Sequence, residues 1–215
     1  MAGYVANSSP VLVQCVGRRL DPAWLCCTFA KQMKRSALLV IDLQRGAFDG
    51  VRSSVIAEPR RLISNALALV SAARRCAMPV IFMQHCEGTG EIFEEGSVQG
   101  QLHQSLAPFP TEKVLKKYES SAFENTNLER ILRELAVEEL ILCGLQSEFC
   151  ISNTAKSALN LGLGVVLAAD GHSTWPTKDE SAGAISARVN NELQASGVTL
   201  RSTAELVQAV GKAQT

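Results

Sequence analysis

The sequence predicts an α/β fold, a three-layer α-β-α sandwich built around a mostly parallel sheet of roughly six strands. Short apolar runs, which are typical of strands buried on both faces, cover residues 37–42, 79–85, 114–117, 140–143, 164–170 and 198–201. Stretches with helical periodicity alternate with these runs, and such alternation indicates parallel strands with helices on both faces of the sheet. A chain of 215 residues is long enough to bury one large core.

The periodic stretches between the strands predict helices, and turn-forming residues predict the loops. We expect helices over residues 59–77, 128–135, 178–196 and 203–212, with Asn125 or Thr126 capping the second of them. A further helix follows residue 146, with Ser147 as its cap and Ile151 and Ala155 on its apolar face. Loops are expected at residues 46–50, 86–112 and 171–175, and the longest of them is expected to shape a site.

Residues 1–35 differ from the rest of the chain, because they are basic and their apolar residues show no clean period. We interpret them as an N-terminal extension that is poorly ordered, and residues 36–215 as the folded domain. They do not resemble a secretory signal, since no continuous apolar segment precedes a small-residue cleavage site. Our hypothesis is that proteolytic removal of residues 1–32 leaves the activity intact.

The charge and cysteine content exclude several classes of protein. The formal net charge is zero, which gives no indication of nucleic acid or an anionic membrane as a partner. No apolar run reaches the ~18 residues of a membrane span. The seven cysteines are irregularly spaced and include no Cys-x-x-Cys pair, so we expect reduced thiols in a cytoplasmic protein.

Cys150 follows a buried strand and falls in the first turn of a predicted helix. A helix N-terminus offers free N–H groups and a positive dipole end, which favour a thiolate and a neighbouring oxyanion. Ligands of open α/β sheets bind at this edge, where the strands end. Position alone does not decide the matter, because a cysteine in a helix is often a small buried hydrophobe.

Two charged residues are predicted at the same edge of the sheet, Asp42 and Lys117, each at the carboxyl end of its strand. Taken singly, Asp42 could cap a turn and Lys117 could be a solvated surface residue. Together with Cys150 they make chemical sense, because thiol chemistry needs a proton acceptor and a cation that stabilises the negative charges.

Residues 37–44, 114–123 and 144–150 resemble, in order and spacing, the isochorismatase-like cysteine hydrolases, a family that includes nicotinamidases and several other amidohydrolases. The Gly-Leu-Gln-Ser-Glu-Phe-Cys block, with Asp-Gly-His-Ser-Thr-Trp at residues 170–175, is most similar to the streptothricin-hydrolase type. The resemblance covers roughly residues 36–210 and implies a hydrolase acting on C–N bonds other than peptide bonds.

The resemblance also implies a role for each site residue. Cys150 is the expected nucleophile, Asp42 the general base and acid, and Lys117 the third member of a triad, with Lys116 the nearest alternative. A cis peptide bond is expected at Leu145–Gln146, and the backbone N–H groups of Gln146 and Cys150 are expected to form an oxyanion hole. The implied reaction is acyl transfer through a thioester.

Metal-dependent relatives carry an Asp-x-His motif after the second strand, which is absent here, where the chain reads Phe-Met-Gln-His-Cys-Glu-Gly. A metal would need three or four converging ligands. We therefore expect no metal and no other cofactor, and a small-molecule amide rather than nicotinamide as substrate. The resemblance further implies a homo-oligomer.

Six further residues are weaker candidates for substrate binding. His85 and His172 are placed to border the pocket, although a structural hydrogen bond is the commoner role for either. Glu148 could contact a basic substrate or favour the helix N-terminus. Aromatic candidates for the pocket wall, any of which could instead be core, are Phe48, Phe123 and Trp175.

Two alternatives come from other classes of function. The chain could be a binding or assembly protein that is catalytically silent and retains the hydrolase fold, but an intact triad argues against this. It could also be a redox protein that uses Cys143 and Cys150. A cysteine inside a strand and another in the following helix make poor exchange partners.

Overall fold

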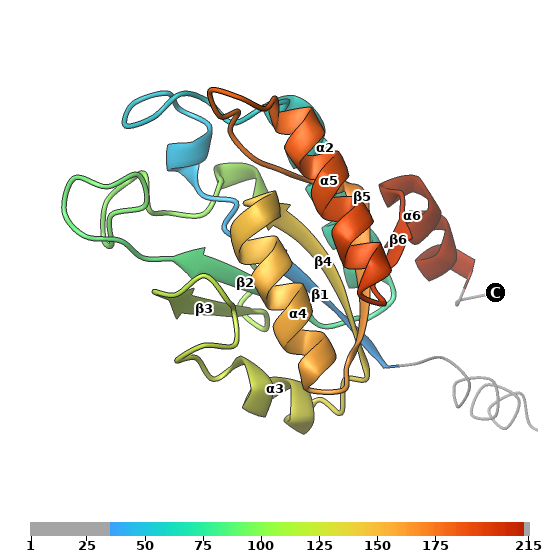
Figure 1. The fold of residues 1–215 in the computed structure, drawn as a ribbon. Coiled ribbons are helices and arrows are strands. Elements are labelled where there is room, and N and C mark those ends of the chain that lie inside the picture. Colours follow the sequence, from blue (N-terminus) through green and yellow to red (C-terminus); the bar gives the residue numbers. More distant parts are fainter. Residues whose placement is uncertain (1–34, 213–215) are drawn as a thin grey trace, which may run out of the picture. The chain divides into compact units, whose positions relative to one another are not determined.

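The computed structural model describes residues 35–212. The predictions about an N-terminal extension therefore fall, except for Arg35, outside the described residues. The part of the chain that is described contains a six-stranded sheet in the order β3-β2-β1-β4-β5-β6, in which every neighbouring pair is parallel (Figure 1). The strands are β1 (Ser36–Ile41), β2 (Val80–His85), β3 (Lys113–Lys117), β4 (Glu139–Leu145), β5 (Gly164–Ser173) and β6 (Thr199–Arg201).

Helices cover both faces of this sheet, so the predicted three-layer sandwich is confirmed. The helices are α2 (Pro59–Arg75), α3 (Leu128–Glu134), α4 (Ser152–Asn160), α5 (Ala182–Ala195) and α6 (Thr203–Lys212). Successive residues of β1 alternate between the two cores, as a strand with period two requires. Leu39 packs with residues of α3, α4 and α5, whereas Leu38 packs with residues of α2 and α6.

β4 approaches β1 so closely at Gly144 that only glycine fits. A Cβ atom on Gly144 would lie 1.9 Å from the carbonyl oxygen of Ile41, and the backbone there has a φ of +128°. The same place disturbs the pairing of β4 with β5, whose register shifts between Leu142 and Gly144. This irregularity lies just before the segment that carries Cys150.

Two local predictions were wrong in this region. β5 does not end at Asp170 but continues through Ser173, because it pairs with β4 again beyond the register shift, with His172 opposite Gly144. Ser147 does not cap a helix either. The chain forms a π-helical turn at Ser147–Ile151 before α4 begins, and no side chain caps that turn. The remaining helices and strands lie within a few residues of their predicted bounds.

The long loop between β2 and β3 is mostly irregular, with one short 3-10 helix at Gln104–Leu106. Two isolated bridges order it, one between Gln44 and Leu102 and one within the loop between Glu87 and Glu94. The buried side chain of Gln44 adds three hydrogen bonds of 2.8 Å, which join the backbone of His85 to the carbonyl of Gly100. The loop is therefore tied to the carboxyl edge of the sheet.

Candidate active site

Asp42 follows the last residue of β1 with a φ of +53°, a left-handed conformation that aspartate tolerates better than most residues. Its backbone N–H donates to the carbonyl of Met83 in β2 at 3.1 Å, so the turn is anchored to the neighbouring strand. The residue is 1 % exposed. A carboxylate is thereby held at the carboxyl edge of the sheet, where it was predicted.

Lys117 ends β3 and is completely buried. Its Nζ lies 2.8 Å from Asp42 Oδ2 and 3.2 Å from Cys150 Sγ, and it also donates to the carbonyl of Glu119 at 3.1 Å. A buried ammonium is tolerated only where such partners replace water. The neighbouring Lys116 instead points outward and pairs with the exposed Glu95. The structure thus brings Lys117, and not Lys116, to Asp42 and Cys150.

Cys150 lies in the π-helical turn, half-buried, with its sulfur facing the Asp42–Lys117 pair. The hydroxyl of Ser120 lies 4.0 Å from the same sulfur and accepts a hydrogen bond of 2.8 Å from the side chain of Asn153. The Leu145–Gln146 peptide bond is cis, as predicted. Groups from β1, β3 and the turn after β4 therefore meet at one place.

Burial dominates the electrostatics of these three residues. It raises the pKa of Asp42, an effect that Lys117 opposes. Burial alone would lower the pKa of Lys117, but the charges of Asp42 and Cys150 outweigh it and the pKa is raised. Burial, reinforced by Asp42, raises the pKa of the Cys150 thiol to about 11. The pKa of this thiol is therefore shifted in the opposite direction to the one expected from a helix start alone, because burial and Asp42 act on it as well.

His85 ends β2 beside this group. Its Nδ1 lies 3.3 Å from Lys117 Nζ, and its Nε2 lies 3.7 Å from Glu87 Oε1. Burial, and then the charge of Lys117, lowers the pKa of His85 to about 4, so the ring is neutral at pH 7. Because the ammonium of Lys117 can only donate, Nδ1 must accept and the ring proton belongs on Nε2. That N–H faces Glu87.

A cavity of about 330 Å³ opens beside Cys150. Of the six weaker candidates for substrate binding, His85 and Trp175 line it, as does Gln146 of the predicted oxyanion hole. Sequence reasoning missed the other lining residues, which are Glu87, Ile92, Phe93, Tyr118, Ser120, Leu145 and Phe149. Tyr118, Leu145 and Phe149 adjoin predicted site residues in the chain, a signal that could have indicated them.

The other four candidates do not line the cavity. Phe48 packs against the core and meets the His103 ring edge-on at 4.8 Å, and Phe123 packs against the core on the opposite face of the sheet. Oε1 of Glu148 accepts a hydrogen bond of 2.8 Å from Thr174, whose side chain is buried. Core packing therefore occupies Phe48 and Phe123, and the hydrogen bond from Thr174 occupies Glu148, so none of the three lines the cavity.

His172 is the last of the four, and it belongs to a buried hydrogen-bond network. Its Nε2 lies 2.9 Å from Oδ1 of Asn190, whose amide nitrogen donates to the carbonyl of Ala169. Nε2 must therefore donate, and Nδ1 accepts from the hydroxyl of Ser147 at 2.7 Å. Ser147 begins the turn that carries Cys150, so its hydrogen bond to His172 anchors the start of that turn.

The cysteines give no indication of redox exchange. Cys143 is completely buried and packs on the face of the sheet that α2 covers, whereas Cys150 packs against the opposite face. Burial raises the pKa of Cys143 to about 12. Cys86, Cys143 and Cys150 form no disulfide within residues 35–212, whereas Cys15, Cys26 and Cys27 lie outside the described range.

Within residues 35–212, no group of three or more His, Cys, Asp or Glu side chains converges closely enough to hold a metal ion. None of the helices in that range is long and apolar enough to cross a membrane. The predictions of a metal-free site, a cytoplasmic location and a homo-oligomer stay predictions.

Comparison with known proteins points to one family. Residues 36–205 match the isochorismatase domain. Streptothricin hydrolase of Streptomyces noursei is 34% identical over 139 residues, which are 65% of this chain and 50% of that protein. The isochorismatase family protein YddQ of Bacillus subtilis is 36% identical over 129 residues, 59% of this chain and 71% of that protein.

A solved structure of an isochorismatase has a similar fold. An isochorismatase from Pseudomonas putida has a TM-score of 0.74 and 27% identity, and covers 80% of this chain and 89% of its own. The chain spans about half the length of the streptothricin hydrolases that it matches.

Proposed function

Because this chain belongs to the isochorismatase family, we propose that it is a cysteine hydrolase that cleaves a C–N bond of a small amide, lactam or ureido compound. The reaction proceeds through a thioester on Cys150 and needs no metal ion. One observation carries the proposal: Cys150 Sγ lies 3.2 Å from Lys117 Nζ, which lies 2.8 Å from Asp42 Oδ2, beside a cavity of about 330 Å³.

In the first step, Asp42 takes the thiol proton while the sulfur attacks the carbonyl carbon of the substrate. A thiol whose pKa is about 11 needs such a base, because very little of it is ionised at neutral pH. The ammonium of Lys117, within hydrogen-bonding distance of both groups, stabilises the negative charge as it moves from carboxylate to sulfur.

The tetrahedral oxyanion accepts hydrogen bonds from the backbone N–H groups of Gln146 and Cys150. Protonated Asp42 returns its proton to the departing nitrogen, the C–N bond breaks and the thioester remains. A water molecule, deprotonated by the same carboxylate, attacks the thioester carbonyl. The products are the free acid and the regenerated thiol, and Asp42 ends the cycle in its starting state.

A screen of small amides, ureas and lactams against the wild-type protein and the Cys150→Ala variant tests this function. We expect turnover by the wild type, none by Cys150→Ala, and normal rates for Cys86→Ala as the matched control. Rapid quenching followed by mass spectrometry should place the acyl group on Cys150. Undiminished turnover by Cys150→Ala would exclude the mechanism, and saturable binding of these compounds without turnover would support the alternative of a binding protein.

A further inference from the structure

The cavity beside Cys150 carries an unbalanced negative charge. Two carboxylates line it, Asp42 and Glu87, and within the described part of the chain no lysine or arginine does. Lys117, which does not line the cavity, pairs with Asp42 and compensates its charge. Glu87 is therefore the group that sets the sign of the charge that a bound molecule meets.

The Glu87 side chain is held in place by its own loop. Its Oε2 accepts a hydrogen bond of 2.7 Å from the backbone N–H of Phe93, and its own N–H donates to the carbonyl of Phe93 at 3.1 Å. The N–H of Glu95 donates to the carbonyl of Glu87, also at 3.1 Å. Oε1 is the oxygen left to meet a ligand, with the neutral ring of His85 at 3.7 Å.

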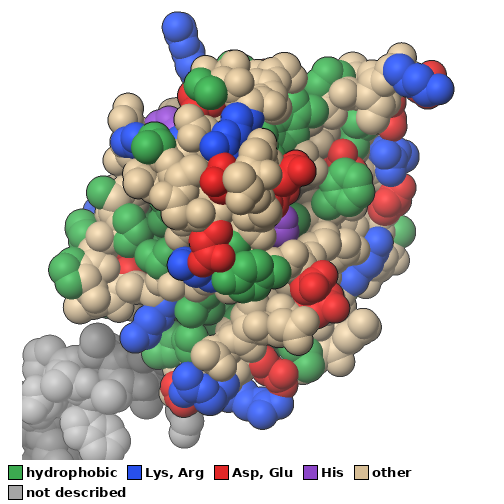
Figure 2. All heavy atoms as spheres, turned by 90° about the vertical axis from the view of Figure 1, so that its left-hand side faces the viewer, with side chains coloured by type: hydrophobic (Ala, Val, Ile, Leu, Met, Phe, Trp, Pro, Cys, Tyr) green, Lys and Arg blue, Asp and Glu red, His purple; other side chains and the backbone are tan. Residues whose placement is uncertain are grey.

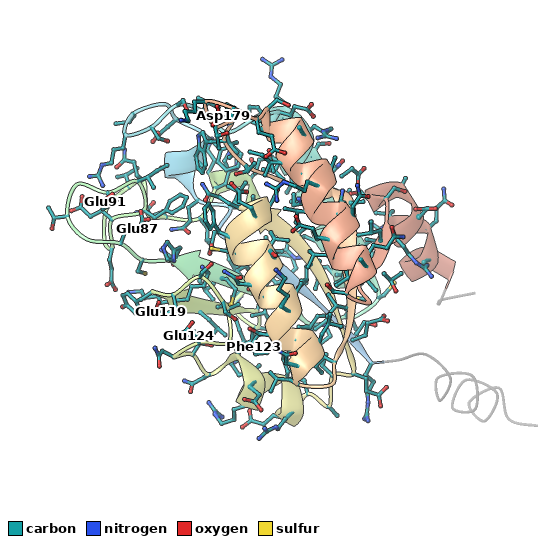
Figure 3. The ribbon with its side chains drawn as sticks, viewed as in Figure 1. Glu87, Glu91, Glu119, Phe123, Glu124 and Asp179 are labelled. Atoms are coloured by element: carbon teal, nitrogen blue, oxygen red, sulfur yellow. The ribbon has the colours of Figure 1, made fainter. Side chains whose placement is uncertain are left out.

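Other carboxylates of the loop between β2 and β3 are paired with permanent cations. Glu94 lies 2.6 Å from Arg52, Glu95 lies 2.7 Å from Lys116, and Glu112 lies 2.8 Å from Arg74. Glu87, whose side chain is 27 % exposed, has no such partner among the described residues. Glu91 also lacks one, but it is exposed at the outer end of the loop, whereas Glu87 lies nearer β2 (Figure 3).

The remaining lining of the cavity suits an organic cation. Four aromatic side chains contribute to it, namely Phe93, Tyr118, Phe149 and Trp175. Aromatic faces attract cations and gain little from anions. On the face that carries the ends of β2 and β3, Figure 2 shows acidic side chains beside hydrophobic ones, with a histidine visible among them.

We propose that this cavity selects amide substrates that carry a cationic group, an ammonium, amidinium or guanidinium, which binds Glu87 while the scissile carbonyl lies at Cys150. This proposal rests on the proposed function, because it assigns a substrate class to the same site. Anionic amides are excluded, because Glu87 repels them and no cationic side chain lines the described cavity to receive them.

A matched panel tests the proposal by turnover: small amides of one size that carry an aminomethyl, a hydroxymethyl or a carboxylate substituent. We expect the wild type to prefer the aminomethyl amide over the hydroxymethyl amide by about tenfold in kcat/KM. Glu87→Gln should remove this preference, and Glu87→Lys should favour the carboxylate. Glu91→Gln, in the same loop but outside the cavity, should behave as the wild type. A preference retained in Glu87→Gln would overturn the proposal.

A second measurement does not need turnover and separates this proposal from the proposed function. Benzylamine, benzyl alcohol and benzoate have similar size and differ in charge, and each can be tested for protection of Cys150 from iodoacetamide at pH 8. Benzylamine should protect the wild type at about tenfold lower concentration than benzyl alcohol, and this difference should vanish in Glu87→Gln. Equal protection by all three would refute charge selection even if amides are cleaved. Protection by benzylamine without any turnover would support charge selection and count against the hydrolase.

Discussion

Asp42 Oδ2 and Lys117 Nζ lie 2.8 Å apart, and both side chains are almost completely removed from solvent. Each charge therefore depends on the other, because burial of an isolated ion costs far more than any single contact returns. This pair joins the end of β1 to the end of β3 across the intervening strand β2. It holds the sheet edge together as well as the site.

Replacing Lys117 with Met should destabilise the protein by about 3–5 kcal/mol, since it leaves the Asp42 carboxylate buried without its partner. Lys116→Met is the control, because its ammonium pairs with Glu95 on the surface, and it should leave the free energy of unfolding nearly unchanged. Urea denaturation at pH 7 measures both free energies of unfolding. Equal losses for the two variants would show that the buried pair is not stabilising.

Asp42→Asn should change hydrolysis and thiol reactivity in opposite directions. The carboxylate raises the pKa of the Cys150 thiol above the value that burial alone would give, so its removal lowers that pKa from about 11. Alkylation of Cys150 by iodoacetamide at pH 8 should become faster, while hydrolysis falls by at least about 100-fold because the proton shuttle is lost. Slower alkylation together with unchanged hydrolysis would contradict both assignments.

His85 should make stability depend on pH. Its pKa is lowered in the folded protein to about 4 from an ordinary value of 6.5, so between these values the unfolded chain binds more protons. The contribution of a neutral His85 is present above pH 6.5 and is lost as the pH falls toward 4. The stability difference between the wild type and His85→Gln should therefore shrink by about 2 kcal/mol over that range. Denaturation curves at pH 4.5, 5.5 and 7 measure it, and a constant difference would argue against a buried neutral ring.

Gly144→Ala should destabilise the protein by at least about 3 kcal/mol, because the new Cβ would lie 1.9 Å from the carbonyl oxygen of Ile41 at a φ of +128°. Gly183→Ala provides the contrast. Gly183 is exposed in α5 with open space around it, so alanine there should stabilise by about 0.5–1 kcal/mol. Thermal or urea denaturation of the two variants tests the difference. A mild effect of Gly144→Ala would mean that β1 and β4 can separate locally.

Asp42, Lys117 and Cys150 could be placed together from sequence because each follows a short apolar run. Parallel strands collect their carboxyl ends at one edge, so a residue that ends a strand has a predictable neighbourhood even when its partner is more than 70 residues away in the chain. The helices were also predictable, because the spacing of apolar residues along the chain shows which face of each helix is buried.

The residues that line the cavity were not predictable in the same way. No propensity signals a π-helical turn at Ser147–Ile151, and the extra residue in such a turn changes the direction in which Glu148 and its neighbours point. The position of Glu87 depends on backbone hydrogen bonds with Phe93 and Glu95, which form only when the loop has folded. The continuation of β5 through His172 depends on a register shift that the sequence does not mark.

The loop between β2 and β3 supplies Glu87, Ile92 and Phe93 to the cavity wall, whereas Asp42, Lys117 and Cys150 come from the strand ends and the turn after β4. The carboxylate proposed to select the substrate therefore lies on a different stretch of chain from the three residues proposed to break the bond. Exchange of the 86–112 segment between relatives should transplant the preference for one compound over another and leave the cleavage chemistry in place, an evolutionary freedom that a site built on a single segment would not have.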